Sequence, residues 1–120
     1  MGLVYVDMEV RREGGRPTAV RFLVDSGASL SVLPRAVWRG LGLAPRRTMR
    51  FGLADGTVVR RPLSDCRFRF EGIDVPSPVV LGQRRDAALL GTLTLEALGL
   101  VLNPFERTLK PARMMLAAAI

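Results

Sequence analysis

The sequence predicts a single, mostly β domain of the barrel or sandwich type, with one or two short helices. A length of 120 residues suits one domain. Apolar residues recur mainly at every second position, which is the period of a strand with one buried face. These runs are short and are separated by Gly, Pro and Asp, as in proteins built from many strands and tight turns.

The N-terminal part of the chain predicts a hairpin that leads into a polar loop. Residues 4–10 alternate between aliphatic and more polar side chains, which indicates a half-buried strand. Residues 13–17 contain two glycines and a proline and are expected to turn the chain. Thr18–Val24 is the expected partner strand. It runs directly into residues 25–29, after which the apolar residues 30–33 are expected to be extended.

A short helix and a second hairpin are expected next. Pro34 suits the first position of a helix, because the N–H that it lacks would have no partner there. Gly42 can end this helix. Residues 51–61 predict a hairpin with Asp55 and Gly56 at its tip, where this pair forms a favoured tight turn.

The C-terminal half predicts several short strands and a second helix. Strands are expected at residues 66–70, 73–75, 79–81, 88–91, 100–102 and 107–110. Thr92 can cap a helix that runs to Leu98, and Gly99 can end it. The domain is therefore expected to span residues 1–111. We expect the apolar tail 112–120 either to lie at a subunit interface or to be disordered.

The residue types exclude several kinds of catalytic site. Histidine is absent, so Ser–His pairs, Cys–His pairs and histidine-rich metal sites are excluded. Cys66 is the only cysteine, which excludes an intrachain disulfide and a zinc cluster and predicts a small core residue. We therefore expect neither a metal nor a cofactor.

Three features favour a cytoplasmic protein that does not enter a membrane. The first residues lack the basic region and apolar run of a signal peptide. No apolar stretch approaches the roughly 20 residues that span a bilayer. A lone thiol also suits a reducing compartment.

The net charge of +7 raises the question of acidic partners. Almost all of the 18 basic residues are arginine, and they are scattered in pairs that are not interleaved with aromatic residues. This pattern favours a solvated surface, so nucleic acid is not the expected partner. A small basic β domain that binds nucleic acid remains a remote alternative. Arg60 and Arg61, in the predicted hairpin, either favour acidic substrates or are solvated strand charges.

The triplet Asp25-Ser26-Gly27 is the strongest candidate for a chemical site. Taken alone it indicates an ordinary turn, because these residues are common in turns. Its surroundings are unusual for a surface turn, since Leu23 and Val24 precede it and the apolar residues 30–33 follow soon after. The buried segment Leu89-Leu90-Gly91, with a predicted helix behind it, follows later in the chain.

These pieces together resemble the retropepsin-like aspartic proteases of clan AA, particularly the small single-domain members of bacteria and archaea. The resemblance covers most of the chain and rests on residues 23–28, 51–61, 89–91 and 98–104. It implies the closed, barrel-like retropepsin fold. It also implies an aspartic endopeptidase that binds a peptide or protein substrate in an extended conformation.

Peptide hydrolysis without metal, histidine or thiol needs one group that accepts a proton from water and another that donates one. Two neighbouring carboxyl groups can do both, because like charges so close together cannot both ionise. This chain has one Asp in a suitable context. The second is therefore expected to be Asp25 of another copy, in a symmetric homodimer.

The resemblance assigns roles to three groups of residues. Asp25 is the catalytic carboxyl, in an active-site loop that continues with Ser26, Gly27 and Ala28. Substrate-binding and flap positions are Ser29, Ala54, Asp55 and Gly56. Leu89, Leu90 and Gly91 support the loop from behind.

Two departures from the retroviral pattern qualify these roles. Ser29 stands where some retroviral members carry a carboxylate that holds the substrate backbone, and the predicted flap has fewer glycines. Ala28 has no hydroxyl to donate to the catalytic carboxylate, which predicts an activity optimum nearer to neutral pH than that of pepsin.

A related module that binds peptides or assembles without cleaving them is the alternative function.

Overall fold

The computed structural model describes residues 3–112, so most of the predicted tail lies outside the described residues. The strands are β1 (Tyr5–Arg11), β2 (Thr18–Val24), β3 (Ser31–Leu33), β4 (Arg47–Gly52), β5 (Val58–Phe70), β6 (Ile73–Leu81), β7 (Leu89–Leu90), β8 (Leu100–Asn103) and β9 (Thr108–Pro111). The helices are α1 (Arg35–Gly40) and α2 (Thr92–Leu98). The mostly β fold with two short helices is thus confirmed.

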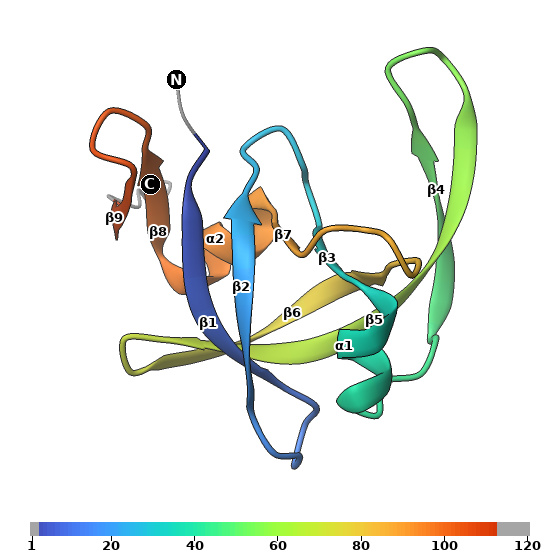
Figure 1. Ribbon diagram of the computed structural model, residues 1–120, viewed down its shortest axis with the longest axis horizontal. Helices are drawn as coiled ribbons and strands as arrows, with labels where there is room; N and C mark the ends of the chain where they lie inside the picture. The colour runs from blue at the N-terminus through green and yellow to red at the C-terminus, as the bar shows by residue number, and fades with distance from the viewer. Residues whose placement is uncertain (1–2, 113–120) are drawn as a thin grey trace, which may run out of the picture.

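Six strands form a closed ring. The sheet has the order β1-β2-β7-β3-β6-β5-β4. Strand β1 also pairs with β5, and this pairing closes the sheet into a ring (Figure 1). Strand β4 pairs only with β5, so the β4–β5 hairpin extends outside the ring. The predicted barrel-like closure is therefore present. Strands β8 and β9 form a separate two-stranded sheet.

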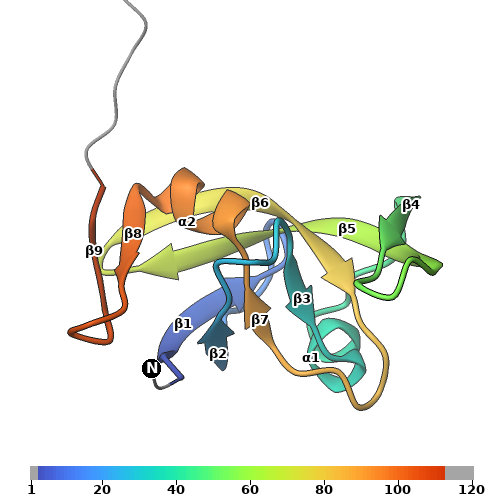
Figure 2. The same ribbon diagram turned by 90° about the horizontal axis from the view of Figure 1, so that it is seen from above.

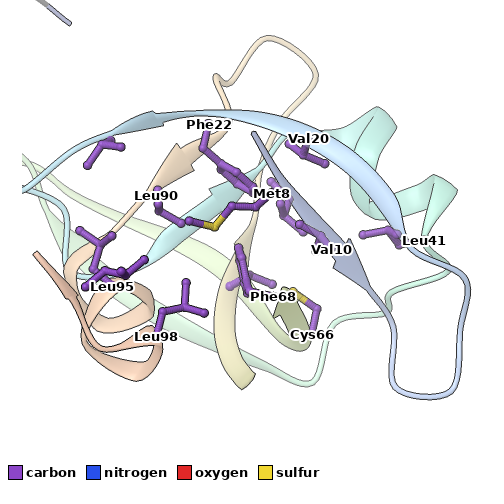
Figure 3. Packing of buried hydrophobic residues seen from close by; sticks show 14 of the residues in the cluster. Met8, Val10, Val20, Phe22, Leu41, Cys66, Phe68, Leu90, Leu95 and Leu98 are labelled. Carbon is purple, nitrogen blue, oxygen red and sulfur yellow. The ribbon is translucent and has the colours of Figure 1, made fainter. Parts of the chain in front are cut away.

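The core fills the ring with aliphatic side chains around two phenylalanines. The rings of Phe22 and Phe68 are both fully buried, with centroids 5.6 Å apart (Figure 3). Met8 and Val10 point inward from β1, which confirms the alternation expected for that strand. Burial of apolar surface of this kind is the main force that holds such a small domain together.

Two long strands replace four of the predicted short ones. β5 continues from the hairpin through Phe70, and β6 continues from Ile73 to Leu81 in unbroken register with it. The prediction of separate strands was wrong because Pro76 and Pro78 read as breaks. These prolines lie in the part of β6 that pairs only with β5, so their missing N–H groups fall on an open edge.

Both helices begin one residue away from the expected position. Pro34 is the N-cap of α1 rather than its first residue, and Gly91, not Thr92, is the N-cap of α2. The left-handed Gly99 ends α2 as expected, with φ of 71°. Figure 2 shows α2 beside β6, and the β8–β9 pair at the opposite end of the molecule from the β4–β5 hairpin. Neither helix, within residues 3–112, is long and apolar enough to cross a membrane.

Candidate active site

The loop of residues 25–29 is held between β7 and the first turn of α2. The backbone N–H of Asp25 donates to the carbonyl oxygen of Leu90 at 3.0 Å. On the other side of the loop, the N–H of Thr92 donates to the carbonyl of Ala28 at 2.9 Å, and the N–H of Leu93 donates to that of Ser29 at 3.0 Å. Segments far apart in the sequence thus fix both ends of the loop.

The loop presents the Asp25 side chain at its surface. The N–H of Gly27 donates to Oδ1 of Asp25 at 2.9 Å, which orients the carboxylate. Asp25 is half-buried, whereas Ser26 and Gly27 are exposed. A Cβ on Gly27 would lie 3.3 Å from the same carboxylate oxygen. A small residue at this position therefore keeps the carboxylate accessible.

Gly91 lies where two backbone segments cross behind the loop. A Cβ at this position would lie 2.5 Å from the carbonyl carbon of Leu30 and 2.9 Å from the nitrogen of Ser31. Leu90, just before it, is fully buried, and Leu89 is half-buried. The structure therefore brings the segment 89–91 against the Asp25 loop, where only glycine fits at position 91.

Three buried hydroxyl groups brace this crossing, and the sequence analysis did not identify them. Oγ of Ser31 accepts a hydrogen bond from the N–H of Gly91 at 3.0 Å and lies 2.6 Å from Oγ1 of Thr94. Thr94 Oγ1 also lies 2.8 Å from Oγ of Ser77. The signal that could have found them was polar residues at inward positions: Ser31 follows apolar Leu30, and Thr94 shares the buried face of α2.

The β4–β5 hairpin carries the predicted flap residues at its tip. Ala54, Asp55 and Gly56 are all exposed, and Gly56 has the left-handed φ of 88° that the turn requires. Both the hydroxyl and the backbone N–H of Thr57 donate to Oδ1 of Asp55, at 2.6 and 2.9 Å. These two bonds, the hydroxyl first, hold the pKa of Asp55 below its ordinary value of 3.8.

The hairpin and the Asp25 loop point to the same side of the ring but do not join. Figure 1 shows the loop after β2 and the tip between β4 and β5 both at the top of the view. Within residues 3–112 no hydrogen bond links the tip, 53–57, to the loop, 25–29.

A groove of about 430 Å³ lies on the other side of the loop. Ser26 lines it together with side chains from the N-terminal segment, α2 and β8. Its lining includes Leu3 and Val101, residues that are 65% and 50% exposed. In the part of the chain that the structure describes, this side of the loop is thus largely apolar and exposed.

Comparison with known proteins decides which family this arrangement represents. A family described as aspartyl protease matches residues 6–94, a span that contains the Asp25 loop, the hairpin and Gly91. The chain belongs to the aspartyl protease family. This aspartyl protease is accordingly a hydrolase, and its resemblance to the retropepsin-like group is confirmed. A search of curated proteins finds no match.

Two solved structures share the fold of this aspartyl protease. EIAV protease, in complex with the inhibitor HBY-793, is 19% identical and superposes with a TM-score of 0.64 over 96% of this chain and 94% of its own. The protease of Simian Foamy Virus (mac) is 22% identical, with a TM-score of 0.53 over 76% of this chain and 92% of its own. Both are retroviral proteases by name, and the likeness is one of fold.

The lone thiol of this aspartyl protease lies away from the Asp25 loop. Cys66 is buried in β5, and this burial, with the charge of Asp65 as a smaller cause, raises its pKa to about 12. The thiolate, which is the reactive form, is therefore scarce at neutral pH. Cys66 is a core residue, as the sequence predicted.

Proposed function

We propose that this aspartyl protease is an endopeptidase that works as a homodimer, with one Asp25 carboxyl from each subunit acting on a shared water molecule. The observation that carries the proposal is the Asp25 loop itself. It holds one oriented, accessible carboxylate and supplies no second acid to work with it. A twofold axis beside the loop would bring an identical carboxyl next to the first.

The two carboxyls would divide the chemistry between them. Close like charges favour a state in which one is ionised and the other protonated. The ionised carboxyl takes a proton from water as the water oxygen bonds to the peptide carbonyl carbon, and the protonated carboxyl donates to the carbonyl oxygen. When the C–N bond breaks, the leaving nitrogen takes up a proton and the carbonyl re-forms.

The surroundings of Asp25 suit these roles. The hairpin tip, 53–57, would close over an extended peptide and exclude water from the reaction. Ser26, exposed beside Asp25, would brace the partner loop across the axis. Leu90 and Gly91 would keep the loop backbone in place from behind.

The apolar groove beside Ser26 supports the location of the dimer contact. Leu3 and Val101 in its lining, and Phe105 at the β8–β9 turn, are at least half exposed in the single chain. Exposed apolar side chains gathered on one side of a small domain are typical of a protein interface. This side adjoins the Asp25 loop, so a contact here would place two loops together.

The decisive experiment combines Asp25→Asn with a mixing test on a peptide library. Asp25→Asn should lower cleavage by at least 100-fold, the low end for a general acid–base group, while the unfolding midpoint stays within a few degrees. Adding excess Asp25→Asn chain to wild type should suppress wild-type activity, because mixed dimers contain only one working carboxyl.

Asp7→Asn is the matched control, since Asp7 is exposed on β1 and forms no ion pair within residues 3–112. It should leave the activity unchanged. Full activity from a strict monomer in light scattering would contradict the shared site. An inert wild type would instead favour a module that binds peptides without cleaving them.

A further inference from the structure

The main sheet has two faces, and the one opposite the core reaches from the Asp25 loop to the β4–β5 hairpin. The core residues Val24, Leu33 and Leu90 alternate along their strands with side chains that point to this second face. Residues that pair directly across strands share a face, so the strand register follows the second face through the sheet. Starting two residues before Asp25, it consists of Leu23, Leu89, Val32, Val80 and Leu63. An apolar face therefore extends from Asp25 to the strand that forms the hairpin.

The hairpin continues the second face with a half-buried set of side chains. Every second residue of β5 before Leu63 lies on this face, and so do the direct partners of these residues in β4. They are Arg61, Val59, Met49 and Phe51, and all four are half-buried. Arg47 at the base of the hairpin shares the face but is exposed, as are Arg50 and Arg60, which pair directly on the opposite face. The half-buried face is thus the one that a closing hairpin would turn toward a peptide held at Asp25.

Arg61 is the half-buried charge in this otherwise apolar set. Its Nη1 donates to the carbonyl oxygen of Arg60 at 2.9 Å, and within residues 3–112 it forms no ion pair. Arg67, a half-buried arginine of the same strand, instead pairs with the carboxylates of Asp74 and Glu13 at 2.6 and 3.3 Å. A guanidinium that loses solvent is stabilised by a carboxylate, which it can bind through two parallel N–H groups. Arg61 therefore has donors left for a carboxylate that another molecule supplies.

We propose that Arg61 binds an acidic side chain of the substrate, so that this protease prefers peptides with Asp or Glu near the scissile bond. The inference rests on the proposed function, in which the hairpin closes over a peptide held at Asp25. The second face then meets the peptide, and Arg61 is the charge on the half-buried part of the hairpin. A homodimer has two Arg61 residues related by its twofold axis, so acidic residues are favoured on both sides of the cleaved bond.

The test compares two peptides that differ only in charge. One carries Asp or Glu on both sides of the cleaved bond, and the other carries Asn or Gln at the same positions. In wild type, kcat/KM should be at least about tenfold higher for the acidic peptide, the factor expected from a single charge-assisted hydrogen bond. This preference should weaken as salt is raised, because Arg61 is partly exposed.

The variant Arg61→Gln should lose the preference, mainly through a higher KM for the acidic peptide. The matched control is Arg60→Gln, which removes the same charge one residue away, from the exposed face, and should keep the preference. Reversal of the charge gives a second comparison. Arg61→Glu should prefer a third peptide, with Lys at the same positions, over the acidic one, whereas Arg60→Glu should not. Each readout is a ratio of two peptides cleaved by the same protein, so a change in overall stability does not alter it.

Three outcomes would overturn the inference while leaving the protease intact: equal cleavage of the acidic and neutral peptides by wild type, a preference that survives in Arg61→Gln, or an equal loss of preference in Arg60→Gln. The last would indicate only general attraction by the net charge of the protein. Failure of the proposed function is distinguishable, because wild type and Asp25→Asn would then be equally inert on every peptide.

Discussion

The Asp25 loop and the β4–β5 hairpin would touch the same substrate, yet they are built in opposite ways. The loop is hydrogen-bonded to β7 and α2. Buried hydroxyl groups brace it, and Gly91 packs behind it so closely that a side chain at that position would not fit. Within residues 3–112, strand β4 of the hairpin pairs only with β5, and the exposed tip residues are held by the hydrogen bonds of Thr57 to Asp55. A reacting group needs fixed geometry, whereas a lid must open to admit a chain.

The largest difference should appear when the same substitution is made in both regions. Gly91→Ala places a Cβ 2.5 Å from the carbonyl carbon of Leu30, so two backbones must separate. We expect a loss of at least about 3 kcal/mol in the free energy of unfolding, at the upper end for overpacked sites, and loss of activity. Gly52→Ala in the hairpin meets nothing within 4 Å and should change stability by no more than about 0.5 kcal/mol.

Urea denaturation of the two glycine variants measures both effects. Similar unfolding free energies would contradict the view that only the loop lacks room. A destabilised Gly52→Ala variant would show that the hairpin is packed more tightly than its exposure indicates.

A smaller loss should follow from cutting the hydroxyl network. Thr94→Val keeps the shape of the side chain and removes its hydrogen bonds to Ser31 and Ser77. Leaving buried polar groups unpaired costs about 1–3 kcal/mol. The conservative variant Thr94→Ser retains the hydroxyl, so it should lose less stability and keep more activity than Thr94→Val. Thermal unfolding and kcat give the comparison, and a Thr94→Ser variant as impaired as Thr94→Val would rule the network out as the cause.

In the hairpin, a comparable change should affect function more than stability. Gly56 has a φ of 88°, so Gly56→Ala strains the tip by about 1 kcal/mol. Because the tip makes few contacts, we expect a small shift of the unfolding midpoint and a several-fold fall in kcat/KM. Ala54→Gly, two residues earlier, introduces no such strain and serves as the control. Unchanged kcat/KM in Gly56→Ala would indicate that the tip plays no part in turnover.

The smallest effect should come from acidification of the hairpin tip. The pKa of Asp55 is lower in the folded hairpin than its ordinary value of 3.8. The ionised carboxylate therefore stabilises the folded hairpin above pH 3.8, and this stabilisation is lost as the pH falls through the lower folded pKa. The amide proton of Thr57, which donates to Asp55, should therefore shift with a midpoint below 3.8 in an NMR titration. The amide of Gly91, bonded to the Ser31 hydroxyl, should not titrate in that range. A Thr57 midpoint at or above 3.8 would contradict this.

Much of the fold could be predicted because strand signals are local. The strand Thr18–Val24 has the expected bounds, and the helix Thr92–Leu98 ends where expected, since alternation marks the one and Gly99 the other. The continuation of β5 and β6 was missed because Pro62, Pro76 and Pro78 read as ends. Whether a proline interrupts a strand depends on which edge its missing N–H would face, and only the pairing of the strands decides that.

The candidate site divides in the same way. A lone Asp-Ser-Gly with an apolar frame, in a chain without histidine, already indicated half of a two-carboxyl site. The bracing by Ser31, Thr94 and Ser77 was not predicted, because these residues are far apart in the chain and only the tertiary structure shows that their hydroxyl groups meet.

By itself, the sequence determined which segments form strands, turns and helices, which catalytic chemistries are excluded, and which carboxyl is the candidate for the reaction. These are properties of neighbouring residues or of composition. Only the tertiary structure decided that β1 meets β5 to close the ring, that Gly91 has no room for a side chain, and that Arg50 faces Arg60. Contacts of this kind depend on strand register, which the whole core sets and no local pattern records.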